Sequence, residues 1–288
     1  MEGKIKRRGI FLVFFLSFSL AIIFCIRISL KNSTIFWVDF FNIGQGDAAF
    51  IHFDNGQKML VDCGPDKTIL SKLGGVMNFF DHTIDYLVVT HPDRDHYGGC
   101  AAVLERYDVK NIFTNGAEKP NDIYWQAWKK DYDNESANKY LINGYQRLVI
   151  GNSELNFLSP DKSLDFKVSA GDTNNFSVVF LLQSSVGRFL FTGDMEMPLE
   201  NALLKKYCLN TRPCPAIMAD YLKVGHHGSK SSSSVDFLRA VAPRFAIISV
   251  GKAPNQYGHP TYRVLHKLQD IGSVIWRTDL LNDIIVKE

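Results

Sequence analysis

Thr90-His91-Pro92-Asp93-Arg94-Asp95-His96-Tyr97-Gly98-Gly99 is the stretch of sequence on which the fold and the chemistry both depend. It follows the apolar run Tyr86–Val89 and precedes a helix-like pattern at Ala101–Leu104, which is typical of a loop between a buried strand and a helix. Two imidazoles and two carboxylates lie within six residues of this loop. Because neighbouring carboxylates repel each other unless a cation or solvent neutralises them, the stretch predicts a metal site at a strand end.

The composition allows one large domain or two small ones with a sizeable core, since the 288 residues are 46% hydrophobic and 22% charged. The formal net charge is +2, and much of this net positive balance comes from the N-terminus, from Lys4, Lys6, Arg7 and Arg8. The rest of the chain is close to neutral. A net charge near zero weakens the hypothesis that the protein binds nucleic acid. It does not exclude it, because a net charge summed over the chain does not reveal local basic patches.

The N-terminus is predicted to be a targeting or anchoring segment, residues 1–31. Its basic start is followed by the apolar run Gly9–Ile26, which as a helix reaches roughly 27 Å, about the thickness of a bilayer core. No small-residue cleavage pattern precedes Arg27, which favours an uncleaved signal anchor over a cleaved signal peptide. The basic flank predicts residues 32–288 outside the cytoplasm, in the periplasm or at the cell surface, or secreted if the segment is cleaved.

Four of the five cysteines lie beyond this segment. Cys208 and Cys214 are close enough in the chain to close a small loop by a disulfide in an oxidising compartment. Cys63 and Cys100 flank motif segments and are expected to be buried. The alternative is four free thiols in a reducing compartment.

Strand-like and helix-like segments alternate along the rest of the chain. Hairpins are expected within residues 37–62, 148–158 and 177–192, helices at 199–207, 236–241 and 261–268, strands at 221–224, 245–250, 274–277 and 284–286, and a helix or insert at 121–140. This mixture predicts an α/β protein with two sheets, covered by helices on their outer faces. Nearly every chemical motif follows a strand, where such architectures place their sites.

Seven motifs together resemble the metallo-β-lactamase superfamily, and more narrowly the hydrolase domain of ComEC-type bacterial competence (DNA-uptake) proteins. They are Asn42–Ala48, Leu60–Gly64, Thr90–Gly99, Asn174–Ser177, Phe191–Asp194, Leu222–Ser229 and Asn255–Pro260. The resemblance implies a four-layer αββα sandwich over residues 32–288. The general superfamily motif carries histidine where this chain has Asp93, a departure that is typical of the competence-type branch.

The resemblance also implies a dinuclear metal centre. His91 and Asp93 are expected to hold one divalent ion and Asp95 and His96 the other, with Asp194 as the bridge; His227 is favoured as the last ligand, and His226 is the alternative. Two ions need a bridging carboxylate and ligands from several loops. Mixed imidazole and carboxylate ligands suit Zn, Mn or Fe, and the extra oxygen ligand Asp93 shifts the expectation towards Mn.

Further residues are expected around these ions. Catalytic roles are predicted for Asp95, Asp194, His226 and His259, substrate contacts for Asn175 (or Asn174), Ser177 and Lys223, and orientation of ligands for Asp47 and Asp62. Each has a structural alternative, such as a turn cap for Asp47, bonds to backbone donors for Asp62, a helix start for His259 and plain exposure for Lys223. Trp125, Trp128 and Tyr132 are expected to pack the insert rather than to stack bases.

A water that bridges two such ions ionises near neutral pH, which predicts phosphodiester hydrolysis by a metal-bridging hydroxide without a covalent protein nucleophile. The resemblance points to DNA as the substrate, in single strands at the cell surface. One apolar segment cannot form a channel, so a role in uptake would require a separate channel protein. The alternative substrates are choline-phosphate esters of cell-wall polymers, small phosphodiesters, a lactone or a β-lactam, of which the β-lactam is least favoured because of Asp93. A further alternative is that the protein is a non-catalytic relative of these enzymes. The sequence does not indicate the oligomeric state.

Overall fold

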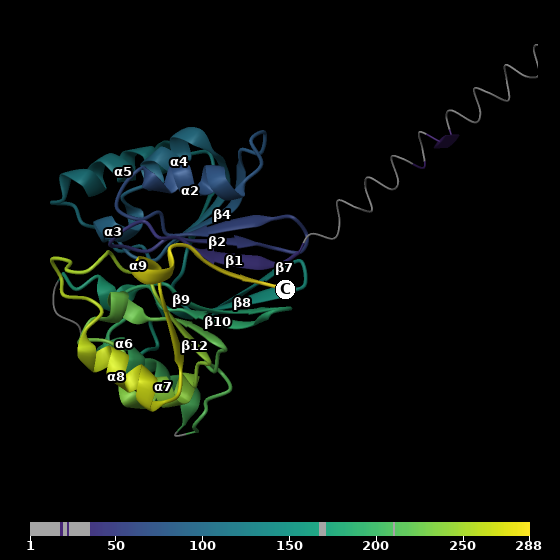
Figure 1. Cartoon of the computed structure of the whole chain (residues 1–288). Coiled ribbons are helices and arrows are strands. Elements are labelled where there is room, and N and C mark those ends of the chain that lie inside the picture. Colours follow the sequence, from purple (N-terminus) through teal and green to yellow (C-terminus); the bar gives the residue numbers. More distant parts are fainter. Residues whose placement is uncertain (1–17, 20–21, 23–34, 167–170, 210) are drawn as a thin grey trace, which may run out of the picture.

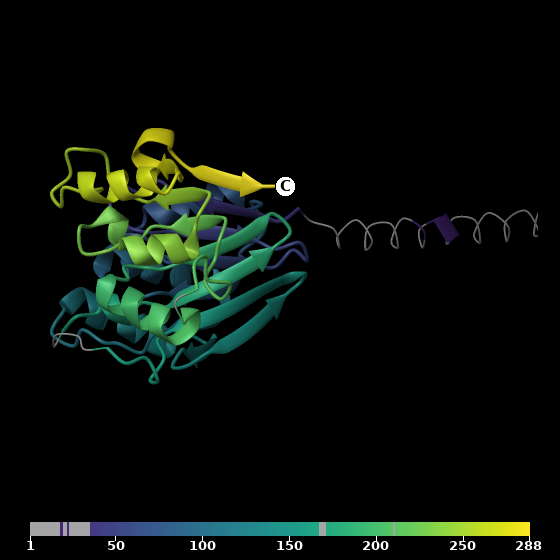
Figure 2. The ribbon, with the colours of Figure 1, turned by 90° about the horizontal axis from the view of Figure 1, so that it is seen from below.

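Two seven-stranded sheets pack face to face within the described residues, and helices cover both outer faces (Figure 1, Figure 2), as the predicted αββα order requires. The structure is a computed structural model that describes residues 18–19, 22, 35–166, 171–209 and 211–288. The predicted signal anchor lies almost entirely outside the described residues. Among the residues that are described, none belongs to a helix long and apolar enough to cross a bilayer.

Sheet A carries the N-terminal motifs. Its strands, in spatial order, are β14 (Ile284–Lys287), β1 (Trp37–Phe40), β2 (Ala49–His52), β3 (Lys58–Val61), β4 (Thr83–Val89), β5 (Asp108–Thr114) and β6 (Asn138–Leu141). Neighbours are antiparallel from β14 to β3 and parallel from β3 to β6. The β2–β3 hairpin turns where expected, because Gly56 adopts a φ of +83° that glycine reaches without steric penalty. The outer face of sheet A is covered by α2 (Thr68–Val76), α4 (Cys100–Arg106) and α5 (Ile123–Asn134).

Sheet B repeats the same pattern with the C-terminal half of the chain. Its strands, in spatial order, are β13 (Val274–Arg277), β12 (Phe245–Ile248), β11 (Tyr221–Lys223), β10 (Gly187–Phe191), β9 (Val179–Ser184), β8 (Ser153–Ser159) and β7 (Gln146–Ile150). Neighbours are antiparallel from β7 to β10 and parallel from β10 to β13. The outer face of sheet B is covered by α6 (Met197–Leu203) with its π-helical extension η2 (Leu204–Cys208), α7 (Val235–Val241) and α8 (Tyr262–Asp270).

Three apolar layers hold the sandwich together, one between the sheets and one under each set of helices. Between the sheets, the ring of Phe191 from sheet B stacks on Phe40 of sheet A at 5.6 Å and on Phe180 at 4.7 Å. Under α5, Trp125 and Trp128 are only 5% and 3% exposed. The two tryptophans therefore pack the insert, as expected, and are not available as a base-stacking platform.

The structure differs from the predicted elements in a few places. Residues 121–140 form α5 followed by the edge strand β6, rather than one helix or insert. Helix α2 and strand β5 have no counterpart among the expected elements. The reason is that α2 contains Gly74 and Gly75, while β5 begins with the exposed polar residues Asp108 and Lys110, which hide its strand pattern.

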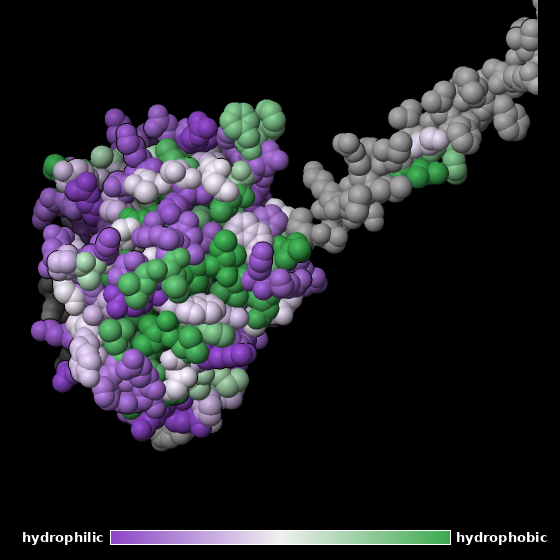
Figure 3. Space-filling view, viewed as in Figure 1, coloured by the Kyte–Doolittle hydropathy of each residue, from purple (hydrophilic) through white to green (hydrophobic). Residues whose placement is uncertain are grey.

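The C-terminal segments form an edge strand in each sheet, β13 in sheet B and β14 in sheet A. After β13 the chain passes through the short helix α9 (Thr278–Leu281) and crosses from sheet B to sheet A, where β14 pairs with β1. Exposed apolar side chains gather over α9 and β14 (Figure 3), among them Leu280, Leu281 and Ile285. The last residues of the chain are thus an integral part of the fold.

Two disulfides are present among the described residues. The predicted Cys208–Cys214 bond is confirmed, with a Cα–Cα distance of 5.3 Å. The second joins Cys63, which follows β3, to Cys100 at the start of α4, with a Cα–Cα distance of 5.2 Å. It ties together the chain segments on either side of the His91–His96 loop.

Asp39 in the middle of β1 is predicted to make stability depend on pH. The side chain is 1% exposed, and its Oδ1 has no hydrogen-bond partner among the described residues. Burial and the nearby carboxylate of Asp283 raise the pKa of Asp39 from 3.8 to about 7, although Lys72 opposes the shift. The stability that the protonated acid contributes is therefore complete below pH 4 and is lost as the pH rises towards 7.

Asp39→Asn is accordingly expected to change the free energy of unfolding little at pH 4 and to increase it at pH 8. The upper bound is about 4 kcal/mol, at about 1.4 kcal/mol for each unit of pKa. Urea denaturation at both pH values measures the difference. A gain that does not depend on pH would contradict the assignment of this pKa to Asp39.

Candidate metal centre

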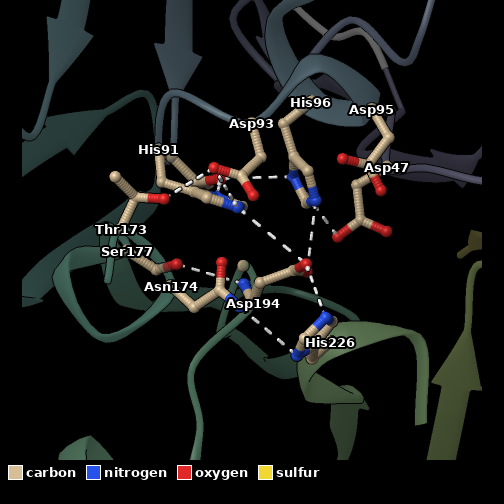
Figure 4. A network of polar contacts seen from close by, with 12 residues as sticks. Asp47, His91, Asp93, Asp95, His96, Thr173, Asn174, Ser177, Asp194 and His226 are labelled. Carbon is tan, nitrogen blue, oxygen red and sulfur yellow. Dashed lines mark hydrogen bonds and ion pairs between the residues drawn. The ribbon is translucent and has the colours of Figure 1, made fainter. Parts of the chain in front are cut away.

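The functional side chains lie at the carboxyl ends of the central strands of both sheets. Sheet A supplies Asp62 after β3 and the loop 90–96 after β4, which runs into the short helix α3 (Arg94–Tyr97). Sheet B supplies Asp194 after β10 and the pair His226-His227 after β11. In Figure 4, Asp194 lies at the middle of the network, with His91 and His96 on one side and His226 on the other.

The β1–β2 loop closes against this centre because of Gly46. Its φ is +136°, and a Cβ at this position would lie 2.3 Å from the backbone oxygen of Asp95. The next residue, Asp47, donates its backbone N–H to the same oxygen at 3.1 Å. Only glycine permits this approach, which brings the Asp47 carboxylate under the site.

His91 and His96 are held in place through their Nδ1 atoms. The Asp62 carboxylate accepts hydrogen bonds from His96 Nδ1 at 2.8 Å and from Thr90 Oγ1 at 2.7 Å. Since the Thr90 hydroxyl donates to Asp62, its oxygen accepts from His91 Nδ1 at 3.0 Å. Both Nε2 atoms are thereby left free and turned towards Asp194 (Figure 4), which is how metal-binding histidines are oriented. The predicted orienting role of Asp62 agrees with this geometry.

His226 and His227 are held in the same way from sheet B. His227 Nδ1 lies 2.9 Å from the carbonyl oxygen of Ser249, and His226 Nδ1 lies 2.9 Å from Glu196 Oε1. Because both partners are acceptors, the imidazoles donate through Nδ1 and present Nε2 towards Asp194. The backbone of both histidines is left-handed, with φ of 48° and 52°, a conformation that non-glycine residues rarely adopt and that is concentrated at functional sites.

Four of these residues form a tight group, namely Asp95, His96, Asp194 and His227, whose ligand atoms all lie within 4.8 Å of one another. His96 Nε2 lies 3.1 Å from Asp194 Oδ1, and His227 Nε2 lies 3.1 Å from Asp95 Oδ2. His96 Nε2 and Asp194 Oδ1 are buried, and neither makes a hydrogen bond within the described structure. A buried imidazole nitrogen and a buried carboxylate oxygen that lie close together without a hydrogen bond fit a shared cation, because leaving both atoms unsatisfied is unfavourable.

A looser group lies on the other side of Asp194. His91 Nε2 is 3.9 Å and His226 Nε2 is 3.8 Å from Asp194 Oδ2. Asp93 Oδ1 lies 4.0 Å from His91 Nε2, but the same oxygen accepts from Lys119 Nζ at 2.5 Å and from Thr173 Oγ1 at 2.6 Å. The predicted pair of His91 and Asp93 is thus adjacent, and a lysine partly neutralises Asp93.

The electrostatics of the site call for positive charge. Burial lowers the pKa of His91, as does the neighbouring His96. For His227, the Asp194 and Asp47 carboxylates outweigh the effect of burial and raise the pKa to about 10. Against its own burial, Asp194 has a pKa held well below the usual value by His227 and His96. Ionised carboxylates enclosed in this way favour a bound cation.

Lys223 does not face a substrate, contrary to the prediction. Its side chain is 4% exposed, and its Nζ lies 2.6 Å from Asp47 Oδ2. Asp47 Oδ1 in turn lies 3.3 Å from His227 Nδ1, which agrees with the orienting role predicted for Asp47. Lys223 thus compensates the charge of Asp47 from behind the site, because its strand directs the side chain into the space between the sheets.

Asn175 and Ser177 are also buried rather than turned towards a substrate. Ser177 Oγ accepts from the backbone N–H of Asp194 at 3.1 Å. Asn175 Oδ1 accepts from the backbone N–H groups of Glu196 and Leu199 and so orders the start of α6. Both side chains thus have structural roles, and the substrate contacts predicted for them stay predictions. The alternative residue, Asn174, is the one whose amide lies near His226 (Figure 4).

His259 lies at the rim of the site, as its predicted role requires. Its ring centroid is 5.6 Å from that of His226, and its Nδ1 is buried without a hydrogen-bond partner among the described residues. The Asn255 side chain holds the backbone of His259, by accepting from its N–H at 3.1 Å and by donating to its carbonyl oxygen at 2.5 Å. The catalytic role of His259 stays a prediction.

Several residues of the site were not foreseen. Glu196 binds His226 and also accepts from the Ser231 hydroxyl at 2.7 Å; an acid two residues after Asp194 was a visible signal. Lys119 and Thr173, which bind Asp93, come from segments far away in the sequence, and nothing in their local pattern marks them.

Comparison with known families and proteins agrees with this geometry. The sequence model of the Metallo-beta-lactamase superfamily matches residues 42–252. The chain is 30% identical over 262 residues to ComE operon protein 3 of Bacillus subtilis, covering 84% of this chain and 32% of that protein. It is 29% identical over 252 residues to competence protein ComA of Neisseria gonorrhoeae, covering 84% of this chain and 31% of that protein. The chain therefore spans about a third of the length of these relatives.

Solved structures support the fold. The metallo-beta-lactamase fold protein YhfI from Bacillus subtilis superposes with a TM-score of 0.56 and 12% identity, covering 88% of this chain and 100% of that one. A diphosphatase from the PhnP family superposes with a TM-score of 0.54 and 11% identity, covering 87% of this chain and 98% of that one. At these identities the likeness concerns the fold alone.

Proposed function

The chain belongs to the metallo-beta-lactamase superfamily, and from the geometry of its site we propose that it is a dinuclear metal-dependent hydrolase of phosphodiesters, with DNA as the favoured substrate. One observation carries the proposal: four imidazole Nε2 atoms surround the single carboxylate of Asp194. Asp194 is thereby placed to serve two ions, one in the tight group and one in the looser group.

The donor set fits two divalent ions, Zn or Mn. Asp95, His96, His227 and Asp194 would hold the first ion. His91, Asp194 and His226, with Asp93 beside them, would hold the second. Such ions, when bound, lower the pKa of a coordinated water and stabilise negative charge on a phosphoryl oxygen. Mixed nitrogen and oxygen donors are compatible with either metal.

The residues at the rim would act on the substrate. His226 is 25% exposed at its side chain, and half-buried His259 lies beside it, so both are within reach of an incoming phosphate. Glu196, bound to His226 Nδ1, raises the pKa of that imidazole against the effect of burial. His226 Nε2 would hold the second ion, so His259 is the imidazole at the rim that would contact a phosphoryl oxygen and help orient the ester. Thr173 and Lys119 keep Asp93 in place beside it.

DNA is favoured over other phosphodiesters because a relative with 29% identity is named as a competence protein, ComA of Neisseria gonorrhoeae. The matched part is about a third of each relative, so transport of DNA would depend on regions beyond it or on a separate channel protein. A role in DNA uptake is accordingly proposed for cleavage alone.

A panel of substrates tests the reaction. The purified protein, loaded with Mn or Zn, is expected to hydrolyse bis-p-nitrophenyl phosphate and a single-stranded oligonucleotide, and to leave the chromogenic β-lactam nitrocefin intact. Release of p-nitrophenol and gel electrophoresis measure the first two activities. Rapid turnover of nitrocefin without turnover of either phosphodiester would contradict the proposal, as would inactivity on every substrate with every metal.

We further propose that residues 1–31 anchor the protein in the membrane and that the hydrolase domain, residues 32–288, lies outside the cytoplasm. The apolar run before Arg27 supports this, and so do the two disulfides, which persist in oxidising compartments. Alkaline phosphatase fused after Glu288 is expected to be active, because it folds only outside the cytoplasm. An inactive fusion, together with an active cytoplasmic reporter at the same position, would contradict the topology.

A further inference from the structure

A second cavity opens at the same end of the sandwich as the metal centre. Its volume is about 250 Å³, and it is called the side pocket below. The residues that line it are Asn115, Gly116, Leu141, Ile142, Asn143, Ser159, Pro160, Asp161, Lys162, Phe166, Asn175 and Phe176. They follow the carboxyl ends of β5, β6 and β8 or precede β9. The metal centre itself follows β4, the neighbour of β5, and β10, the neighbour of β9.

This arrangement brings the two sites close together. Neighbouring strands lie about 4.8 Å apart, so the side pocket begins roughly 5–10 Å from the metal centre. A single turn, η1 (Asn174–Phe176), separates the two: Asn174 lies near His226, while Phe176 lines the side pocket. A ligand of one sugar's length can therefore reach from the side pocket to the metal centre.

The walls of the side pocket suit a flat aromatic ring. Phe176, which is 39% exposed, and Phe166 lie with their ring centroids 6.3 Å apart, and Leu141 and Ile142 complete the apolar surface. The size suits one ring system rather than a large molecule. Apolar walls with a few polar groups are typical of small-molecule sites.

The polar groups of the side pocket are free to bind a ligand. Ser159 is 1% exposed, and its hydroxyl has no hydrogen-bond partner among the described residues. A buried hydroxyl without a partner is unfavourable, which points to a ligand that supplies one. At the rim, the amide of Asn143 and the ammonium of Lys162 make no hydrogen bond or ion pair within the described part of the chain.

The charges argue against a choline group as the ligand. A quaternary ammonium needs an electron-rich cage and is repelled by a cation at the rim such as Lys162. The only carboxylate in the lining of the side pocket, Asp161, is already bound to Lys206 and to Ser163. A neutral ring with hydrogen-bonding edges, attached to a phosphate, fits the surroundings better.

We propose that the side pocket binds a nucleobase, and that it positions the nucleotide whose phosphate reaches the metal centre. The base stacks on the exposed ring of Phe176, with Phe166 beside it, its edge meets Ser159 and Asn143, and Lys162 contacts a neighbouring phosphate. This inference rests on the proposed phosphodiesterase function and narrows its substrate to nucleotides and nucleic acids.

Three esters with the same p-nitrophenol leaving group test the proposal on the unmodified, metal-loaded protein. They are thymidine 5′-(p-nitrophenyl phosphate), bis-p-nitrophenyl phosphate and p-nitrophenylphosphorylcholine. The expected kcat/KM for the thymidine ester exceeds that of each of the others by about tenfold, since base stacking contributes roughly 5- to 150-fold. An equal or lower kcat/KM for the thymidine ester would overturn the proposal, and preference for the choline ester would identify the competing ligand.

Variants locate the effect in the side pocket. Phe176→Ala is expected to lower the ratio of kcat/KM for the thymidine ester to that for bis-p-nitrophenyl phosphate by about tenfold. Ser159→Ala is expected to lower the same ratio in a protein whose apolar walls are intact. The matched control is Phe80→Ala, an exposed phenylalanine in the turn before β4, at the opposite end of sheet A. A ratio unchanged in both pocket variants would overturn the proposal.

A binding measurement tests the side pocket independently of the proposed hydrolase function. If no ester is cleaved, the proposed hydrolase function is wrong. Calorimetric titration of thymidine 5′-monophosphate into the metal-loaded protein still tests whether the side pocket binds a nucleobase. Binding that Phe176→Ala weakens about tenfold supports the pocket. Binding unaffected by Phe176→Ala, or no binding, rejects it.

Discussion

Asp194→Ala is expected to abolish hydrolysis, with kcat/KM for bis-p-nitrophenyl phosphate reduced by at least about a thousandfold, and to remove bound metal. The reason is that, among the described residues, the Asp194 carboxylate is the one acid recorded near all four Nε2 atoms, at 3.1 Å from His96, 3.6 Å from His227, 3.8 Å from His226 and 3.9 Å from His91. Without it, neither the tight nor the looser group retains its shared oxygen ligand. Metal content by mass spectrometry and turnover measure the two effects together.

A matched control for this variant is Glu200→Gln. Glu200 is also a buried carboxylate, 1% exposed, but it accepts from the backbone N–H groups of Ser233 and Ser234 outside the metal centre. Burial raises its pKa, so its neutral isostere is expected to preserve both metal content and turnover. If Asp194→Ala retained metal and activity, Asp194 would not be the bridge between two ions.

His227→Ala and His226→Ala are expected to differ in which ion is lost. His227 Nε2 belongs to the tight group, 3.1 Å from Asp95 Oδ2, so His227→Ala should lose the tightly bound ion and at least about a hundredfold in kcat/KM. His226 lies only in the looser group, so His226→Ala should keep the tightly bound ion while turnover falls. Titration against a chelating dye resolves the two affinities.

The pair forms its own control, because both histidines have left-handed backbones and each loses the same side chain. Thermal unfolding of both variants without metal separates a change in folding from a change in ligation. Full metal content in His227→Ala together with loss of the tight ion in His226→Ala would reverse the assignment of the two residues.

Much of the fold was predictable because short local motifs in the sequence mark the ends of several strands and helices. The loop 90–96 between an apolar run and a helix located β4 and α4, and the turn at Gly56 located the β2–β3 hairpin. Elements without such signals were missed: α2 buries only Ile69 and Leu73 on one side. Strand β6 is fully exposed at the edge of sheet A, so it carries no apolar alternation that a pattern could reveal.

The candidate site was predictable in its ligands and less so in its surroundings. The four ligand residues of the tight group lie in motifs that can be recognised directly in the sequence. Whether a polar side chain faces the site or the core depends on contacts between sheets, which no local pattern contains. Lys223, for example, has the sequence pattern of an exposed lysine on a strand, whereas its ion-pair partner Asp47 comes from the other sheet. Likewise, the Cys63–Cys100 bond depends on how the β3 end meets α4.

Metal-dependent turnover of a phosphodiester tests the proposed function most directly. The purified protein is stripped with a chelator and titrated with Mn or Zn, while bound metal and hydrolysis of bis-p-nitrophenyl phosphate are followed in the same samples. We expect no turnover in the stripped protein, and turnover that rises to a plateau as two ions bind per chain. A fully loaded protein that leaves the phosphodiester intact, or a stripped protein that cleaves it as fast, would contradict a dinuclear phosphodiesterase.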